Sequence, residues 1–221
     1  MQCAEVKPEN LLFDLDGTLT DPKPGITECL RYALGKMGRE APPRDDLLWC
    51  IGPPLLKSFV ILLEDDSQDV CEEALRHYRE RFSTIGLFEN SVYPEVPDVL
   101  DELSKAGMKL FVASSKPEVF VRRILQHFGL SPFFVQMYGS HLDGTFAEKA
   151  DLIRNVLAVE DLLAEKTWMI GDRLHDVIGA KANGLRAVGV TYGFGSEREL
   201  REAGADDLVS SPREVLSVLG D

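Results

Sequence analysis

Strand-like and helical patterns alternate along the second half of this 221-residue chain, and this rhythm restricts the possible folds more than any other feature. Apolar runs typical of strands occupy 109–113, 134–138, 167–171, 186–190 and 207–209. Helical patterns occupy 96–106, 117–128, 148–158 and 175–183, and a last helix is expected from Pro212. Strands that alternate with helices form a parallel sheet covered on both faces. We therefore predict an α/β fold with its ligand site at the carboxyl ends of the strands.

The stretch between residues 22 and 89 differs, because no strand-like alternation occurs in it. Apolar residues recur at helical spacing over 25–37, over 47–63 with an interruption at Gly52-Pro53-Pro54, and over 67–82. Proline-bearing segments at 21–24 and 92–94 flank the stretch. The stretch is therefore predicted to be helical throughout.

Two carboxylates, Asp14 and Asp16, follow an apolar run near the N-terminus. Alternate residues of a strand point the same way, so both acids can lie on one side of the chain. Gly17-Thr18 then breaks the strand where backbone groups must approach something closely. Neighbouring acids repel each other unless a cation or a shared proton separates them. The pair therefore indicates a magnesium site with one carboxylate free as a nucleophile; a plain Asp-Gly turn is the alternative.

Three further candidates follow in order along the chain. Ser114 ends a strand run before a helix, where it can bind a phosphate together with helix amides or serve only as an N-cap. Lys149 begins a helical pattern, where a single lysine is otherwise a solvated surface charge. Asp172 ends another strand and can ligate a hard cation, with Asp176 one helical turn further on. Asp14, Ser114 and Asp172 thus all lie at predicted strand ends.

This series resembles the four motifs of the haloacid dehalogenase (HAD) superfamily. The first motif is Phe13-Asp14-Leu15-Asp16-Gly17-Thr18-Leu19, and the helical insert after it resembles the cap of the C1 branch. The resemblance extends from Leu11 into the C-terminal segment. It implies a Rossmann-like parallel sheet core with helices on both faces, a discontinuous domain of residues 1–21 and 90–221. It also implies an inserted all-helical cap domain, residues 22–89, with hinge linkers at 21–24 and 92–94.

The resemblance also implies a reaction, the hydrolysis of a phosphomonoester through an aspartyl-phosphate intermediate. Asp14 would be the nucleophile, and Asp16 would protonate the leaving group and then activate water. Ser114 and Lys149 would neutralise the phosphoryl oxygens. Dehalogenation is not expected, because haloacid dehalogenases lack the carboxylate found here at Asp16.

The cofactor implied by the resemblance is Mg²⁺. Asp14, the backbone carbonyl of Asp16 and Asp172 would hold it, with water and a phosphate oxygen completing an octahedron. Asp176 would orient a metal-bound water or Lys149. The expected substrate contacts in the core are Gly17, Thr18 and Ser115.

Net charge and cysteine content limit the partners and the compartment that we expect for this chain. The net charge of −13 disfavours nucleic-acid polymers and anionic membranes, because both require basic clusters. A small phosphorylated metabolite remains suitable, since a metal ion and lysines can reverse the field locally. Cys3, Cys29, Cys50 and Cys71 are scattered without a C-x-x-C pair, which fits a reduced compartment. The first residues lack an apolar signal core, so we expect a cytoplasmic protein. The expected oligomeric state is a monomer or a homodimer.

Other functional classes are less compatible with the sequence. GxSxG, HExxH and GxxxxGKS do not occur in it, which argues against serine hydrolases, zinc proteases and P-loop enzymes. Residues 142–145 repeat the letters Asp-Gly-Thr without a preceding strand and are predicted to be a loop, and 193–196 a turn. A phospho-accepting receiver or a non-catalytic binding module is the competing class, but receivers have no helical insert after the first strand.

The substrate is the least constrained part of the prediction. Segments 113–117 and 192–200 resemble phosphoglycolate phosphatases. Within that group, segment 51–55 and the tail at 192–196 are more similar to a bacterial 5′-nucleotidase branch. Trp49 could stack on a base and Lys57 could meet a polar substrate edge; the alternative for Trp49 is helix packing. We expect a 5′-nucleotidase acting on nucleoside 5′-monophosphates, purines above all. Phosphoglycolate or another small phosphometabolite is the runner-up, and a phosphosugar mutase is a further alternative.

Overall fold

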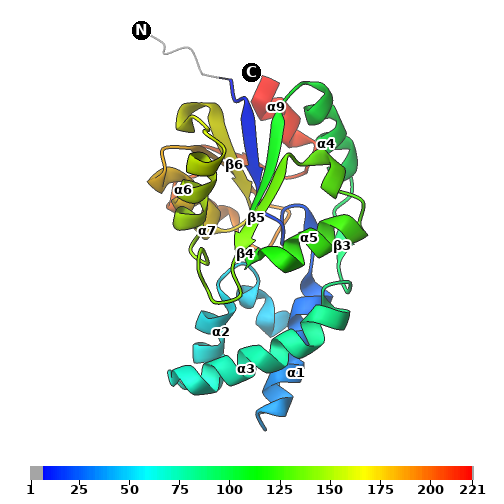
Figure 1. Ribbon diagram of the computed structural model, residues 1–221, viewed down its shortest axis with the longest axis vertical. Helices are drawn as coiled ribbons and strands as arrows, with labels where there is room; N and C mark the ends of the chain where they lie inside the picture. Colours follow the sequence, from blue (N-terminus) through cyan, green and yellow to red (C-terminus); the bar gives the residue numbers. More distant parts are fainter. Residues whose placement is uncertain (1–6, 221) are drawn as a thin grey trace.

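Six parallel strands form the central sheet of the computed structural model, which describes residues 7–220 (Figure 1). Their order across the sheet is β5-β4-β1-β6-β7-β8. The strands are β1 (Asn10–Phe13), β4 (Lys109–Pro117), β5 (Gln136–Ser140), β6 (Thr167–Gly171), β7 (Arg186–Val190) and β8 (Asp207–Val209). Every neighbouring pair is parallel, so the predicted α/β fold is confirmed.

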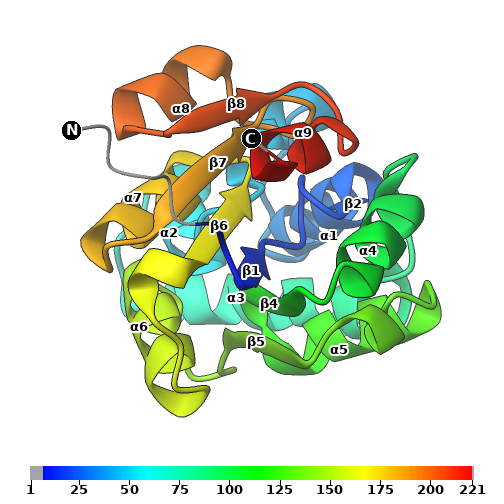
Figure 2. The same ribbon diagram turned by 90° about the horizontal axis from the view of Figure 1, so that it is seen from above.

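Helices cover both faces of the sheet (Figure 2). They are α4 (Val96–Lys105), α5 (Glu118–His127), α6 (Lys149–Val159), α7 (Leu174–Ala182), α8 (Glu197–Ala203) and α9 (Glu214–Gly220). Leu11 and Phe13 of β1 belong to the hydrophobic cluster shared with α4 and α5, whereas Leu12 belongs to the cluster under α6 and α7. Successive strand residues therefore serve opposite faces, and the central strand is apolar throughout.

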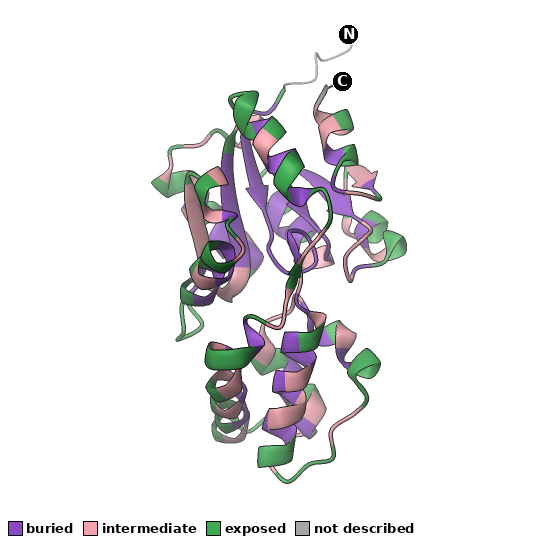
Figure 3. Ribbon diagram, turned by 90° about the vertical axis from the view of Figure 1, so that its right-hand side faces the viewer, coloured by how far each residue is buried: buried purple, intermediate pink, exposed green. Residues whose placement is uncertain are grey.

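A second group of elements lies beyond the carboxyl ends of the strands (Figure 1). It consists of α1 (Lys23–Lys36), the 3₁₀-helix η1 (Arg44–Cys50), α2 (Leu55–Leu63), α3 (Gln68–Arg81) and the π-helix η2 (Phe82–Gly86). In this fully described stretch no strand occurs, as the sequence predicted. We call residues 22–89 the helical lobe and the remainder the sheet lobe; Figure 3 shows the narrow connection between them.

The two connecting segments pair with each other. β2 (Thr20–Asp21) and β3 (Ser91–Val92) form a short antiparallel ladder. Sequence patterns predicted hinges at 21–24 and 92–94 but not this ladder, because two residues a strand carry no periodicity. Between 47 and 63 the chain forms two helices, since Gly52 has φ +107° and Pro53 and Pro54 provide no N–H donors.

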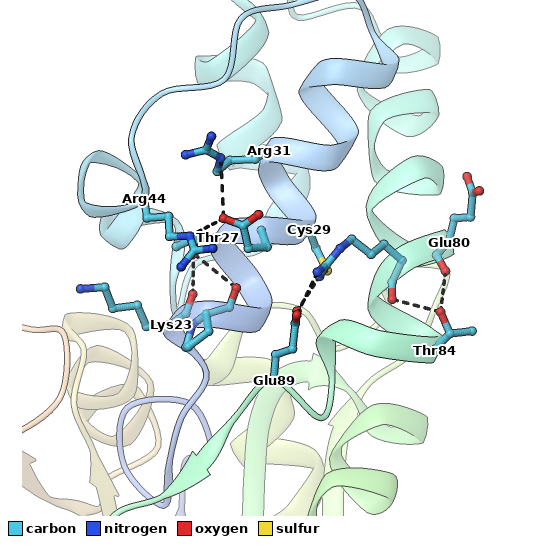
Figure 4. Close-up of polar contacts among 11 residues, drawn as sticks. Lys23, Thr27, Cys29, Arg31, Arg44, Glu80, Thr84 and Glu89 are labelled. Atoms are coloured by element: carbon cyan, nitrogen blue, oxygen red, sulfur yellow. Dashed lines mark hydrogen bonds and ion pairs between the residues drawn. The ribbon is translucent and has the colours of Figure 1, made fainter.

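Close packing holds the base of the helical lobe together. A Cβ on Gly25 would lie 2.0 Å from the carbonyl oxygen of Gly86, and the N–H of Gly25 donates to the Glu89 carbonyl at 2.9 Å. Arg81 donates to both carboxylate oxygens of Glu89, at 2.6 and 3.0 Å, and to the thiol of Cys29 (Figure 4). The first turn of α1 is thereby fixed against the end of α3.

The remaining sequence predictions concern cysteines and membranes. Cys29, Cys50 and Cys71 are buried free thiols in the described part of the chain, and Cys3 lies outside the described residues. Within residues 7–220, no helix is both long enough and apolar enough to cross a membrane.

Candidate active site

The predicted catalytic residues meet at the carboxyl edge of the sheet. Asp14 follows β1, Ser114 lies in β4 and Asp172 follows β6, and these three strands are adjacent. Lys149 is the first residue of α6, and Asp176 lies in the first turn of α7. All five side chains are buried. Residues up to 162 positions apart in sequence thus share one site because parallel strands end at the same edge.

Lys149 is the electrostatic centre of this group. Its Nζ lies 2.8 Å from Oδ1 of Asp14 and 2.7 Å from Oδ1 of Asp176, and it donates to the Ala113 carbonyl at 2.8 Å. Burial lowers the pKa of Lys149, but the two carboxylates outweigh burial and raise it, so the ammonium form is held. Lys149 is therefore held between Asp14 and Asp176.

Three carboxylates form a candidate metal centre. Oxygen atoms of Asp14, Asp172 and Asp176 lie within 4.8 Å of one another. Burial, followed by repulsion from Asp176 and Asp14, raises the pKa of Asp172 well above its usual range. Burial likewise raises the pKa of Asp176 to about 6, although Lys149 opposes the change.

One carboxylate oxygen of Asp172 is hydrogen-bonded and the other has no hydrogen-bond partner among the described residues. Its Oδ2 accepts the backbone N–H of Phe194 at 2.8 Å, whereas its buried Oδ1 has no hydrogen-bond partner among the described residues. Glycines allow two loops to wrap around it: a Cβ on Gly17 would lie 2.1 Å from Oδ2, and one on Gly193 would lie 2.4 Å from the Asp172 Cβ. An unpartnered carboxylate oxygen among hard oxygen donors fits Mg²⁺. The turn predicted at 193–196 is confirmed, and it closes over the acids.

Asp16 has a partner that the sequence reasoning did not select. Nζ of Lys116 lies 2.9 Å from Oδ1 and 2.6 Å from Oδ2 of Asp16, and 4.7 Å from the ring centroid of Phe82 in the helical lobe. Burial raises the pKa of Asp16 although Lys116 opposes the change. The signal was available, because Lys116 follows the Ser114-Ser115 pair directly.

A cavity of about 770 Å³ opens over these residues. From the sheet lobe it is lined by Asp14, Asp16, Ser114, Ser115 and Lys116. From the helical lobe it is lined by apolar and aromatic side chains, among them Ile26, Pro53, Leu55, Leu75, Tyr78 and Phe82. Charged residues of α3, including Asp69, Glu73, Arg76 and Arg79, and the loop at 141–144 complete the lining. The loop predicted at 142–145 is confirmed and belongs to this wall.

Four of the five residues predicted only as substrate contacts, Gly17, Thr18, Trp49 and Lys57, are not part of the described cavity lining. Trp49 is 37% exposed and is not part of the cavity lining, because η1 directs the neighbouring Cys50 inward instead. Lys57 is also outside the lining and forms an ion pair of 2.6 Å with Glu148. Thr18 is buried, and its hydroxyl has no partner within residues 7–220. Of the residues predicted only as substrate contacts, Ser115 alone belongs to the described lining.

Comparisons with known proteins agree with this geometry. A family model described as haloacid dehalogenase-like hydrolase matches residues 11–190. A 5′-nucleotidase of Pseudomonas aeruginosa is 49% identical over 91% of this chain and 90% of that protein. Tyrosine-protein kinase PtkA of Mycobacterium tuberculosis is 39% identical over 85% of this chain and 64% of its own. A phosphoglycolate phosphatase of Vibrio parahaemolyticus is 28% identical over 95% of each chain. The crystal structure of a predicted phosphatase from Clostridium acetobutylicum has a TM-score of 0.94 and 41% identity, covering 98% of this chain and all of that one.

Proposed function

The chain belongs to the haloacid dehalogenase-like hydrolase family, and we propose that it is a Mg²⁺-dependent phosphatase that acts on nucleoside 5′-monophosphates. The observation that carries the reaction type is that Asp14 and Asp16 line one cavity while Lys149 contacts Asp14 at 2.8 Å. The 49% identity to a 5′-nucleotidase over nine-tenths of both chains supports the choice of substrate.

The proposed reaction has two steps. A carboxylate oxygen of Asp14 attacks phosphorus, the bond to the ester oxygen breaks, and the leaving alkoxide takes a proton from Asp16. Asp16 then accepts a proton from water, whose oxygen attacks the aspartyl phosphate and releases inorganic phosphate and free Asp14. Ser114 and Lys149 stabilise the charge on the phosphoryl oxygens in both steps, Lys149 from its position 2.8 Å from Asp14.

The residues proposed to hold Mg²⁺ are Asp14, the backbone carbonyl of Asp16 and Asp172. The partnerless Oδ1 of Asp172 and the close approach of three carboxylates support this choice. When bound, the ion supplies positive charge to the acids and to the phosphoryl group. Asp176 is proposed to orient Lys149, with which it forms an ion pair of 2.7 Å.

Cavity size and lining support a nucleoside leaving group. A volume of about 770 Å³ far exceeds the needs of a two-carbon acid, and Tyr78, Phe82 and Pro53 provide apolar surface for a flat ring. Phosphoglycolate remains the second candidate on a specific observation, because Lys116, Arg76 and Arg79 line the same cavity and cations bind a carboxylate.

The helical lobe is proposed to act as a cap. In this proposal residues 1–21 and 90–221 form the core domain, and residues 22–89 form a separate domain that opens at the β2–β3 connection to admit substrate. The partner is a small phosphorylated metabolite. Action in the cytoplasm is proposed from the buried free thiols of Cys29, Cys50 and Cys71.

A substrate screen tests the proposal. The purified protein is assayed with Mg²⁺ for phosphate release from nucleoside 5′-monophosphates, phosphoglycolate, sugar phosphates and p-nitrophenyl phosphate. Nucleoside 5′-monophosphates are expected to give the highest kcat/KM, with purines above pyrimidines. If phosphoglycolate exceeds them by about tenfold, the second candidate replaces the first. Phosphate release from none of these substrates would contradict a phosphatase.

A further inference from the structure

Arg173 connects the loop that carries Asp172 to the helical lobe. Its guanidinium Nη1 donates to the backbone carbonyl of Ile51 in the helical lobe, and its Nε donates to Oε1 of Glu199 at 2.9 Å. Arg173 is 9% exposed, whereas the lobe-to-lobe contacts of Lys57 with Glu148 and of Arg79 with the Leu142 carbonyl are solvent-exposed. A buried, charge-assisted contact excludes water and is therefore the stronger constraint on lobe placement.

The sheet-lobe end of this connection is itself fixed. Glu199 accepts a second hydrogen bond from the backbone N–H of Leu174 at 3.0 Å, and its own N–H donates to the Ser196 hydroxyl at 3.1 Å at the start of α8. The backbone N–H of Arg173 donates to Asp176 at 3.1 Å. The guanidinium therefore extends from a rigid junction of β6, α7 and α8.

The helical-lobe end is shaped to receive the arginine. Gly52 follows Ile51, and a Cβ there would lie 2.8 Å from Cγ of Arg173. Its φ of +107° is also a conformation that other residues rarely adopt. Gly52, Pro53 and Pro54 then continue directly into the cavity wall. The position of this wall over the substrate thus depends on where Arg173 holds Ile51.

We propose that Arg173 is a positioning residue for substrate selection: it locks the 51–54 segment of the helical lobe over the cavity without contacting the reacting atoms. Substrates whose leaving group reaches this wall should depend on Arg173, and substrates too small to reach it should not. The activity part of this inference rests on the proposed phosphatase function, whereas the locking contact does not.

The test compares Arg173→Met with Arg173→Lys and a matched control, Arg198→Met, whose side chain is exposed on α8 and pairs with Glu202 at 2.8 Å. Met keeps an unbranched stem as far as the position of Nε and loses both contacts. Lys can donate to Ile51 or to Glu199 but does not reproduce the fork, so its effect should be intermediate. Because Lys keeps the charge, it also provides a folded variant if Met disrupts folding.

Hydrogen exchange measures the contact without any substrate. In Arg173→Met, peptides covering 48–58 should exchange about tenfold faster than in the wild type, while strand 167–171 should remain protected. Arg198→Met should change neither. Unchanged exchange at 48–58, or equal acceleration in the sheet, would overturn the proposal. This measurement remains decisive even if the protein hydrolyses no phosphate ester.

Steady-state kinetics then test whether Arg173 affects the selection between large and small substrates. For nucleoside 5′-monophosphates, Arg173→Met should raise KM about tenfold and change kcat by less than about threefold, because the reacting groups stay in place. For a small ester such as methyl phosphate both constants should stay within about threefold of the wild type. Arg173→Lys should recover part of the nucleotide KM. An equal loss for both substrates, carried by kcat, would show that Arg173 acts on the chemical step and overturn the positioning role.

Discussion

The carboxyl edge of the sheet and the wall formed by the helical lobe are two halves of one cavity with opposite character. The edge is charged: Asp14 and Asp176 contact a single buried ammonium, and Asp172 has an open oxygen. The wall is mainly apolar around Tyr78 and Phe82, with charges of α3 on the same lining. We propose that the difference separates the tasks: the edge would act on the phosphoryl group that all phosphomonoesters share, and the wall would contact most of the leaving group, which differs between esters.

Asp14→Asn should produce the largest effect, because it removes the chemistry of the sheet edge and leaves the cavity wall unchanged. The amide keeps the size of the side chain and removes the nucleophile, so kcat should fall by at least about 10⁴-fold. The fold should survive, because Lys149 keeps its contacts with Asp176 and the Ala113 carbonyl. Circular dichroism and phosphate release measure both outcomes.

A control for that variant lies on the same helix as Lys149. Asp151→Asn removes an exposed carboxylate that pairs with Arg154 at 2.8 Å, and activity should be unchanged. Wild-type turnover by a folded Asp14→Asn protein would contradict the proposed mechanism.

Metal removal should abolish activity for every substrate alike, because the proposed metal ligands lie at the carboxyl edge of the sheet and not in the wall that contacts the leaving group. Chelation with EDTA should stop phosphate release, and Mg²⁺ should restore it, whereas Ca²⁺ should inhibit since it prefers a larger and looser ligand shell. Mg²⁺ should also raise Tm, because it binds the folded acid cluster, and Asp172→Ala should lose this shift. Full activity in metal-free buffer would contradict the roles of Asp14 and Asp172.

Asp16→Asn should have a smaller effect that depends on the leaving group. Loss of the proton donor should lower kcat for alkyl phosphates by about 10²- to 10³-fold, and should affect p-nitrophenyl phosphate less because its leaving group needs no proton. Lys116 would keep its contact with the Phe82 ring, so the cavity should remain formed. Equal and unreduced rates for both ester classes would show that Asp16 is not the acid.

The same contrast explains what could be predicted from the sequence. Asp14, Ser114 and Asp172 each directly follow an apolar run in the sequence, and such runs converge at one edge of a parallel sheet, so the local pattern was sufficient even though β4 continues past Ser114 to Pro117. Lys116 and Arg173 were missed because their partners, Asp16 and the Ile51 carbonyl, are about a hundred or more positions away in sequence. The contact of Arg173 depends on how the two lobes pack, and that of Lys116 depends on β4 lying beside β1. No local periodicity encodes either pairing.

Trp49→Ala should have the smallest effect, and it tests whether the wall that contacts the substrate extends to Trp49. The sequence left base stacking and helix packing both open for Trp49. In the structure its side chain is 37% exposed, lies outside the cavity lining and belongs to a 3₁₀-helix that directs Cys50 inward. The substitution should therefore change kcat/KM by less than about twofold, as is usual for surface residues, and equally for nucleotides and phosphoglycolate. Competition assays with both substrates in one reaction measure the ratio directly. A loss of tenfold or more confined to nucleotides would mean that Trp49 reaches the substrate when the lobes close further, and would extend the wall to η1.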